Sequence, residues 1–92
     1  MRRVTIKKVV INDFEVQARW VREQFGARSE QRMRRRLAGV LKLLQSHPFI
    51  GVRNPDLELY RVSVDYHSSL IYTVGSDEVK VLQLVQNRRK SK

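Results

Sequence analysis

The sequence contains no cysteine, only two histidines and no apolar run long enough to cross a membrane. The lack of cysteine excludes disulfide bonds and thiolate zinc sites, and two histidines alone do not favour a structural metal. A transmembrane helix needs about 20 successive apolar residues, and Met1-Arg2-Arg3 is not followed by the apolar stretch of an export signal. We therefore expect a cytoplasmic protein that needs no metal and no small-molecule cofactor and does not bind membranes.

Acidic residues are scarce as well. Nine Asp and Glu face 19 Lys and Arg, which gives the 92 residues a formal net charge of +10. A surface of this charge attracts polyanions and steers their approach, so we expect nucleic acid or an acidic protein as a partner. The alternative is that the charge only keeps the protein soluble. The length and the 41% of hydrophobic residues suit a single folded domain, which we place at residues 1–92.

The first helical segment is predicted at residues 13–25, where Phe14, Ala18, Val21 and Phe25 form one apolar stripe. Residues 4–11 are rich in β-branched side chains and predict a strand, after which Asn12-Asp13 would cap the helix. Gly26 would end the helix in the left-handed conformation.

A second apolar stripe recurs at helical spacing between Gly26 and Pro48. We expect this helix to begin near Ser29 and to end at His47, before the proline. Its stripe consists of Met33, Leu37, Val40, Leu41 and Leu44. Two amphipathic helices separated by so short a turn predict a helical hairpin.

Beyond Pro48 the apolar periodicity changes to two. Residues 57–64, 69–74 and 79–85 are β-prone runs separated by turn-rich segments, and they predict an antiparallel meander preceded by a loop at 49–56. The order β-α-α-β-β-β predicts an α+β fold, a small antiparallel sheet backed on one face by the helical hairpin. Alternation along the strand then places Arg61 on the sheet face that no helix covers.

Several segments in this order resemble one family, the RelE/ParE toxins of bacterial and archaeal toxin–antitoxin pairs, over nearly the whole chain. The segments are Trp20-Val21-Arg22-Glu23-Gln24-Phe25-Gly26, Leu44-Gln45-Ser46-His47-Pro48-Phe49-Ile50-Gly51, Tyr60-Arg61, Leu70-Ile71-Tyr72-Thr73-Val74 and Arg88-Arg89. The resemblance implies a growth-arresting toxin that is neutralised by a co-expressed acidic antitoxin. The family fold, a sheet backed by a helical hairpin, agrees with the predicted element order.

The resemblance also implies two classes of target. RelE-like members cleave mRNA on the ribosome without a metal, whereas ParE-like members inhibit DNA gyrase and have no nuclease site. We expect the RelE-like activity. ParE-like gyrase inhibition and a non-toxic basic binding module of the same fold are the alternatives.

Metal-free RNA cleavage by the 2′-hydroxyl needs cations at the phosphate and groups that transfer protons. Arg61 matches the strand arginine common in RelE-like sites, and we expect Arg53, Arg88 and Arg89 to converge on it, unless Arg61 forms a salt bridge across the strands. His67 is a candidate for proton transfer, although a solvated turn residue is its default interpretation. The chain end lacks the tyrosine or histidine that many RelE-like enzymes carry there.

Two further sets of residues suggest binding surfaces. The side chains of Arg28, Arg32, Arg35 and Lys42 fall opposite the apolar stripe of the second helix and form a candidate RNA-binding ridge, with a solvated helix face as the alternative. Val16 and Trp20 lie one turn apart beside the stripe of the first helix. They either pack against the second helix, as the spacing favours, or bind a partner, and we name them as candidate partner-binding residues.

Overall fold

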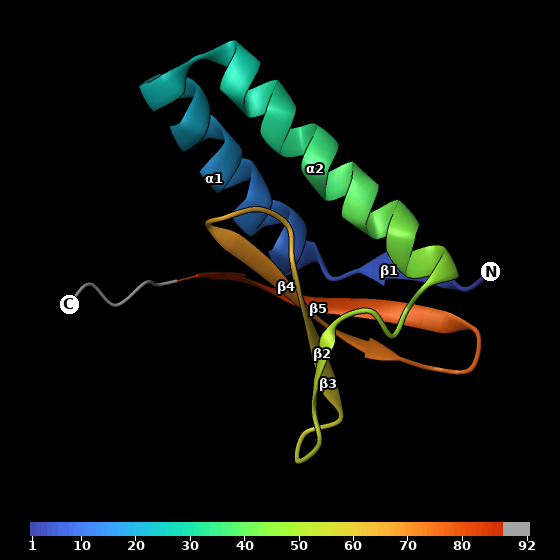
Figure 1. Ribbon diagram of the computed structural model, residues 1–92. Helices are drawn as coiled ribbons and strands as arrows, with labels where there is room; N and C mark the ends of the chain where they lie inside the picture. Colours follow the sequence, from blue (N-terminus) through green and yellow to red (C-terminus); the bar gives the residue numbers. More distant parts are fainter. Residues whose placement is uncertain (88–92) are drawn as a thin grey trace.

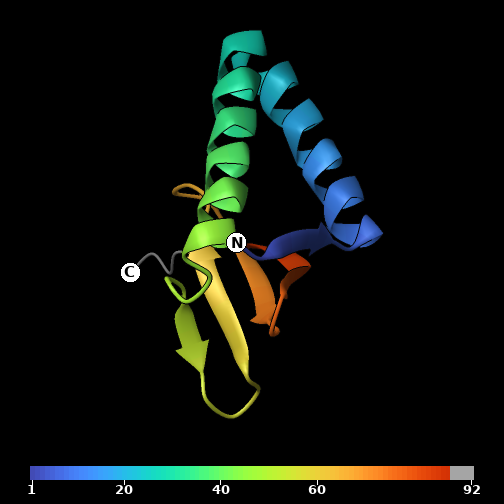
Figure 2. The same ribbon diagram turned by 90° about the vertical axis from the view of Figure 1, so that its right-hand side faces the viewer.

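The computed structural model describes residues 1–87, and it contains two helices and a five-stranded sheet. The elements in chain order are β1 (Arg3–Ile6), α1 (Lys8–Phe25), α2 (Ala27–Ser46), β2 (Val52–Asn54), β3 (Leu59–Ser63), β4 (Ser68–Val74) and β5 (Glu78–Gln86). Both helices lie on one side of the sheet, and their connecting turn points away from it (Figure 1). Figure 2 shows that the helices diverge from this turn toward the sheet. The predicted α+β architecture is therefore confirmed.

The sheet is mixed, which corrects the prediction of a purely antiparallel sheet. Its strand order is β1-β5-β4-β3-β2, and the meander from β2 to β5 is antiparallel as expected. The first strand, however, pairs in parallel with the last, from Arg3 opposite Glu78 to Ile6 opposite Val81. β2 was predicted as loop, because a three-residue edge strand next to Gly51 and Asn54-Pro55 has too little β pattern to be recognised.

The first helix begins five residues earlier than predicted, at Lys8, so Asn12 and Asp13 lie inside it and cap nothing. The helix start was predicted too late because the β-branched side chains of residues 4–11 favour a strand. Val10 is buried one turn before Phe14, so the apolar stripe begins there, and burial of this side chain outweighs the weak local preference.

Gly26 separates the two helices with a positive φ of 96°, which confirms the predicted end of the first helix. The same residue precedes the first residue of α2, Ala27, so the second helix starts two residues before Ser29, whose hydroxyl instead donates to the Phe25 carbonyl. Phe25, predicted as core, is 65% exposed. The turn that ends the hairpin lies away from the sheet (Figure 1), and Phe25 is the last residue of α1 before this turn.

The main core lies between α2 and the centre of the sheet. Leu44, Leu70, Tyr72, Val79 and Val81 are fully excluded from solvent, and a second cluster of Phe14, Ala18 and Met33 joins the helices to each other. The predicted stripe of the second helix is confirmed, since Met33 and Leu44 are buried and its other three members pack against these clusters. No helix among residues 1–87 is long and apolar enough to cross a membrane.

The buried hydroxyl of Tyr72 fastens the segment that leaves α2 to the sheet. It donates to the Pro48 carbonyl at 2.7 Å and accepts from the Gly51 N–H at 3.0 Å. Burial raises the pKa of this phenol above its usual 10.0, so the hydroxyl keeps the proton that it donates. A side chain at Gly51 would lie 2.6 Å from that oxygen and 2.8 Å from the Arg61 carbonyl, so only glycine fits there.

We expect Tyr72→Phe to lower the free energy of unfolding by about 1–3 kcal/mol, because a buried carbonyl and a buried N–H lose their partner. The matched control is Tyr60→Phe, which removes the hydroxyl of the ring stacked 5.4 Å away on Tyr72. That hydroxyl forms no hydrogen bond within residues 1–87. Urea unfolding measures both variants, and equal losses would contradict the proposed role of the Tyr72 hydroxyl.

Candidate functional site

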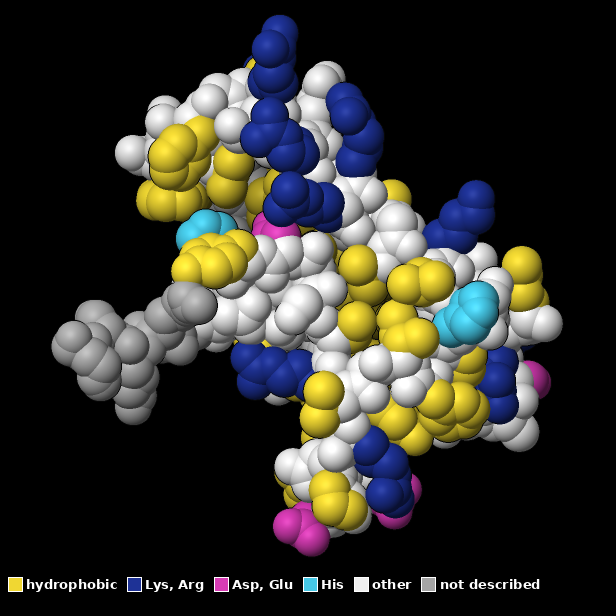
Figure 3. Space-filling view, in the orientation of Figure 1, with side chains coloured by type: hydrophobic (Ala, Val, Ile, Leu, Met, Phe, Trp, Pro, Cys, Tyr) yellow, Lys and Arg dark blue, Asp and Glu magenta, His cyan; other side chains and the backbone are white. Residues whose placement is uncertain are grey.

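A groove of about 940 Å³ runs between the helical hairpin and the adjoining ends of β4 and β5. Its apolar lining comes from both helices and from β5, and consists of Val16, Trp20, Val21, Phe25, Met33 and Leu84. Arg32, Arg36 and His67 are among its polar lining residues. Figure 3 shows hydrophobic side chains gathered near the free end of the hairpin, next to several Lys and Arg side chains.

Val16 and Trp20 face this groove and do not pack against α2, which corrects the packing that their spacing favoured. Val16 is 62% exposed and Trp20 is 53% exposed. The ring of Trp20 lies against that of Phe25, edge to face, with 5.7 Å between the ring centroids. Large apolar side chains that lie together in the open mark an interaction surface.

The groove brings together residues that the sequence assigned to three different roles. His67 was a candidate catalytic residue and Arg32 a candidate RNA-binding residue, and both line the groove beside Val16 and Trp20. The turn that carries His67 is fixed in place, because the Asp65 carboxylate accepts from the backbone N–H groups of His67 and Ser68 at 2.8 and 2.9 Å. The Ser68 hydroxyl donates to Gln17 on α1 at 3.2 Å, which ties this turn to the helix.

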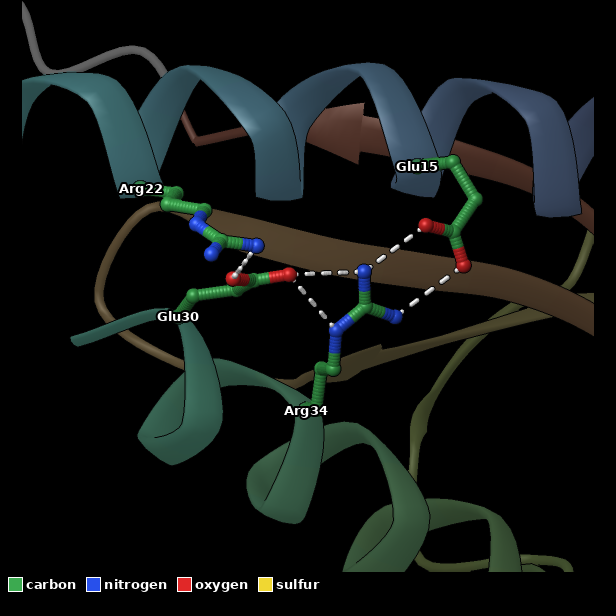
Figure 4. Close-up of polar contacts among 4 residues, drawn as sticks. All are labelled: Glu15, Arg22, Glu30 and Arg34. Carbon is green, nitrogen blue, oxygen red and sulfur yellow. Dashed lines mark hydrogen bonds and ion pairs between the residues drawn. The ribbon is translucent and has the colours of Figure 1, made fainter. Parts of the chain in front are cut away.

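Ion pairing on the hairpin centres on Arg34, a residue to which sequence analysis gave no role (Figure 4). Its guanidinium donates to both carboxylate oxygens of Glu15, at 3.0 and 2.7 Å, and to Glu30 at 3.0 Å. Glu30 also lies 3.8 Å from Arg22. These hydrogen bonds raise the pKa of Arg34 and hold the pKa of the Glu15 carboxyl below its usual 4.5.

The predicted basic ridge is exposed along α2, as expected from its position opposite the apolar stripe. Within residues 1–87, none of its four members forms an ion pair. The ridge consists of Arg28, Arg32, Arg35 and Lys42, all of them exposed. Its positive charge is therefore not neutralised within the described chain.

Arg61 lies exposed on the sheet face opposite the helices, as predicted, and it forms no salt bridge within residues 1–87. Its guanidinium donates to the side-chain oxygen of Asn87 at 2.8 Å. The same oxygen accepts from the Ser69 hydroxyl at 2.7 Å, and the Asn87 amide group donates to the carbonyls of Asp65 and Tyr66. Nothing in the local sequence of Asn87 indicates this clamp.

Arg53 does not converge on Arg61, which corrects the predicted arginine cluster. Arg53 stands opposite Tyr60 in the β2–β3 register, and residues that face each other across two strands share a sheet face. Arg61 is the next residue after Tyr60 and therefore points to the other face. Arg53 instead forms an ion pair with Glu58 at 2.9 Å. Arg88 and Arg89 lie outside the described residues.

No set of three or more His, Cys, Asp and Glu side chains in residues 1–87 is arranged to hold a metal ion. The described side chains offer surfaces that bind apolar and anionic groups. The groove provides apolar contacts with arginines beside them, whereas the open sheet face provides one fixed guanidinium.

The sequence matches no protein-family model and no curated protein. Solved structures with a similar fold include a chain of the chromosomal ParDE TA system from P. aeruginosa, with a TM-score of 0.80 at 13% identity over 96% of this chain and 98% of that one. A chain of the YoeB-YefM complex from Staphylococcus aureus has a TM-score of 0.62 at 12% identity, over 97% and 99%. At such identities the likeness concerns the fold, and the fold implied by the RelE/ParE resemblance is confirmed.

The Glu15–Arg34 ion pair should make the stability of the fold depend on pH. The carboxylate has a lowered pKa in the folded chain, so its stabilising effect is present above the unfolded-state pKa and is lost as the pH falls through the folded-state value. We expect Glu15→Gln to melt slightly below the wild type at neutral pH and together with it near pH 2. The control is Glu23→Gln, an exposed α1 glutamate without an ion pair in residues 1–87. A gap in melting temperature that persists in acid would contradict the electrostatic explanation.

Proposed function

We propose that the chain is the toxin of a toxin–antitoxin pair, acts in the cytoplasm and binds an acidic antitoxin in the groove between the hairpin and the sheet. The observation that carries the proposal is the groove itself, where exposed Trp20, Val16 and Phe25 lie beside Arg32 and Arg36. The shared fold with chains of two toxin–antitoxin structures supports it, as does the net charge of +10.

The groove favours an amphipathic acidic segment as the occupant. Apolar side chains on one face of such a segment would cover Val16, Trp20 and Phe25, while its carboxylates would meet Arg32 and Arg36. A segment that folds as it binds buries a large area, so salt would weaken the complex only in part. The adjacent reading frame in the genome is expected to encode this acidic partner.

The groove is tested by the double substitution Val16→Ala and Trp20→Ala. Both side chains are more than half exposed, so the melting temperature is expected to stay near that of the wild type. The antitoxin should bind at least tenfold more weakly, since buried aromatic residues dominate interface energies. Calorimetric titration measures the affinity, and co-expression reports whether the antitoxin still restores growth.

The matched control is Leu57→Ala, which removes another exposed apolar side chain, 63% accessible, in the turn between β2 and β3. Leu57→Ala should leave the antitoxin affinity unchanged. If both variants bind like the wild type, the groove is not the antitoxin site. If the wild-type chain alone leaves growth unaffected, it is a binding module and the toxin proposal is wrong.

For the target, we favour DNA gyrase over mRNA. Among the described candidate nuclease residues, Arg53 and Arg61 point to opposite faces of the sheet, and His67 lines the groove on the helix side. A gyrase inhibitor needs a protein-binding surface and no convergent arginines. Pulse-labelling after induction is the test: an early fall in DNA synthesis with an SOS response supports gyrase, whereas an early fall in translation with mRNA cut on ribosomes supports the nuclease.

The nuclease remains a second candidate because Arg61 is held in place on the open face by Asn87 and has no acidic partner in residues 1–87. Under that alternative, Arg61→Ala should abolish mRNA cleavage and leave the melting temperature nearly unchanged, since the side chain is exposed. Leu37→Ala, which removes a side chain packed against both clusters, should instead cost about 2–5 kcal/mol of stability. A large stability loss in Arg61→Ala would make Arg61 a structural residue.

A further inference from the structure

Gly39 lies in the middle of α2 on its exposed side, where nothing in the protein requires a glycine. A Cβ atom placed there would meet no atom within 4 Å, and the helix continues past it without a break. Glycine inside a helix is destabilising relative to alanine, because it loses more backbone freedom on folding. The helix therefore loses stability at this position without gaining an internal contact.

Cations occupy three of the four neighbouring positions on the helix, and the exposed Leu43 occupies the fourth. Residues three and four positions apart on a helix are neighbours, so Arg35, Arg36 and Lys42 flank Gly39, and Arg32 lies one further turn away. None of these four forms an ion pair within residues 1–87. From Arg28 to Lys42 the basic ridge extends for about 21 Å at 1.5 Å per residue.

We propose that α2 docks on the phosphate backbone of double-helical DNA, with Gly39 as the point of closest approach. The absent side chain lets one backbone phosphate reach the helix surface, while the flanking cations neutralise that phosphate and its neighbours. Such contacts bind DNA without reading its sequence. The inference goes beyond the proposed toxin function and does not depend on the target of the toxin.

The composition of the ridge favours duplex DNA over other polyanions. A protein interface needs an apolar centre, which the groove has and the ridge of arginines, lysine and glycine lacks. Single-stranded nucleic acid is bound by stacking bases on aromatic side chains, and the ridge has none. Among duplexes, the phosphates that border the major groove of B-form DNA, about 12 Å wide, are open to an approaching helix, whereas the major groove of A-form RNA is deep and too narrow for one.

The decisive variant is Gly39→Ala, measured in the purified full chain. Because the Cβ meets open space, the variant should melt at a higher temperature than the wild type. Its affinity for a short labelled DNA duplex, measured by fluorescence anisotropy, should fall several-fold, and Gly39→Leu should bind more weakly still. Higher stability with unchanged DNA affinity in both variants would overturn the proposal.

The electrostatic part is tested by the salt dependence of the same binding. Arg35→Gln and Lys42→Gln should each reduce the slope of log K against log salt by about one, the value for one lost phosphate contact. The charge-matched control is Arg19→Gln, an exposed arginine on α1, which should leave the slope unchanged. An equal fall in all three variants would mean that net charge alone attracts the DNA, and the proposal would be wrong.

Three competitor probes identify the partner. Duplex DNA should bind the wild type more tightly than single-stranded RNA, an RNA duplex or polyglutamate, and only DNA binding should respond to Gly39→Ala. Tighter binding of either RNA would overturn the choice of DNA, and tighter binding of polyglutamate would make the ridge a site for acidic protein.

Discussion

The burial of the helical hairpin on a single face of the sheet is the interaction on which the other features depend. Leu44 of α2 is sealed from solvent together with Leu70, Tyr72 and Val81 of the sheet, so the base of the hairpin is held firmly. The opposite end of the hairpin extends past the sheet (Figure 1), and Trp20 and Phe25 are both more than half exposed. The groove is thus a consequence of helices that are longer than the surface they cover.

Because the helices cover only one face of the sheet, the two faces differ in the groups that they can bind. Residues that alternate along β3 send Tyr60 and Val62 toward the core and Arg61 toward solvent, so a polar face with a fixed guanidinium exists because the other face is apolar. The Glu15–Arg34 pair has a similar effect on the hairpin. Arg34 binds the carboxylates of Glu15 and Glu30, and within residues 1–87 the ridge of α2 has no acidic partner.

Much of the fold follows from local patterns in the sequence. The stripe from Met33 to Leu44, the break at Gly26 and the three strands of the meander all obey the periodicity of their element, and they were found. The start of α1 was missed because Val9, Val10 and Ile11 prefer strands locally, and the tertiary contact of Val10 decides. Of the candidate site, the exposure of the ridge and of Arg61 was predictable. The clamp by Asn87 and the separation of Arg53 from Arg61 depend on how the strands are aligned with one another. That alignment cannot be recognised from local patterns in a single sequence.

The parallel pairing of β1 with β5 has a consequence for biosynthesis. Residues 3–6 join the sheet through residues 78–81, so the first strand has no partner until residues 78–81 have left the ribosome. Contacts between distant parts of a chain form slowly, because closing the loop between them costs entropy before any contact is made. During that interval the helical hairpin can form on local contacts, but its apolar stripe has no finished surface to cover it. A translating cell therefore holds a nascent chain that exposes its hairpin before it is a completed domain, and a partner that recognises the hairpin can bind before folding ends.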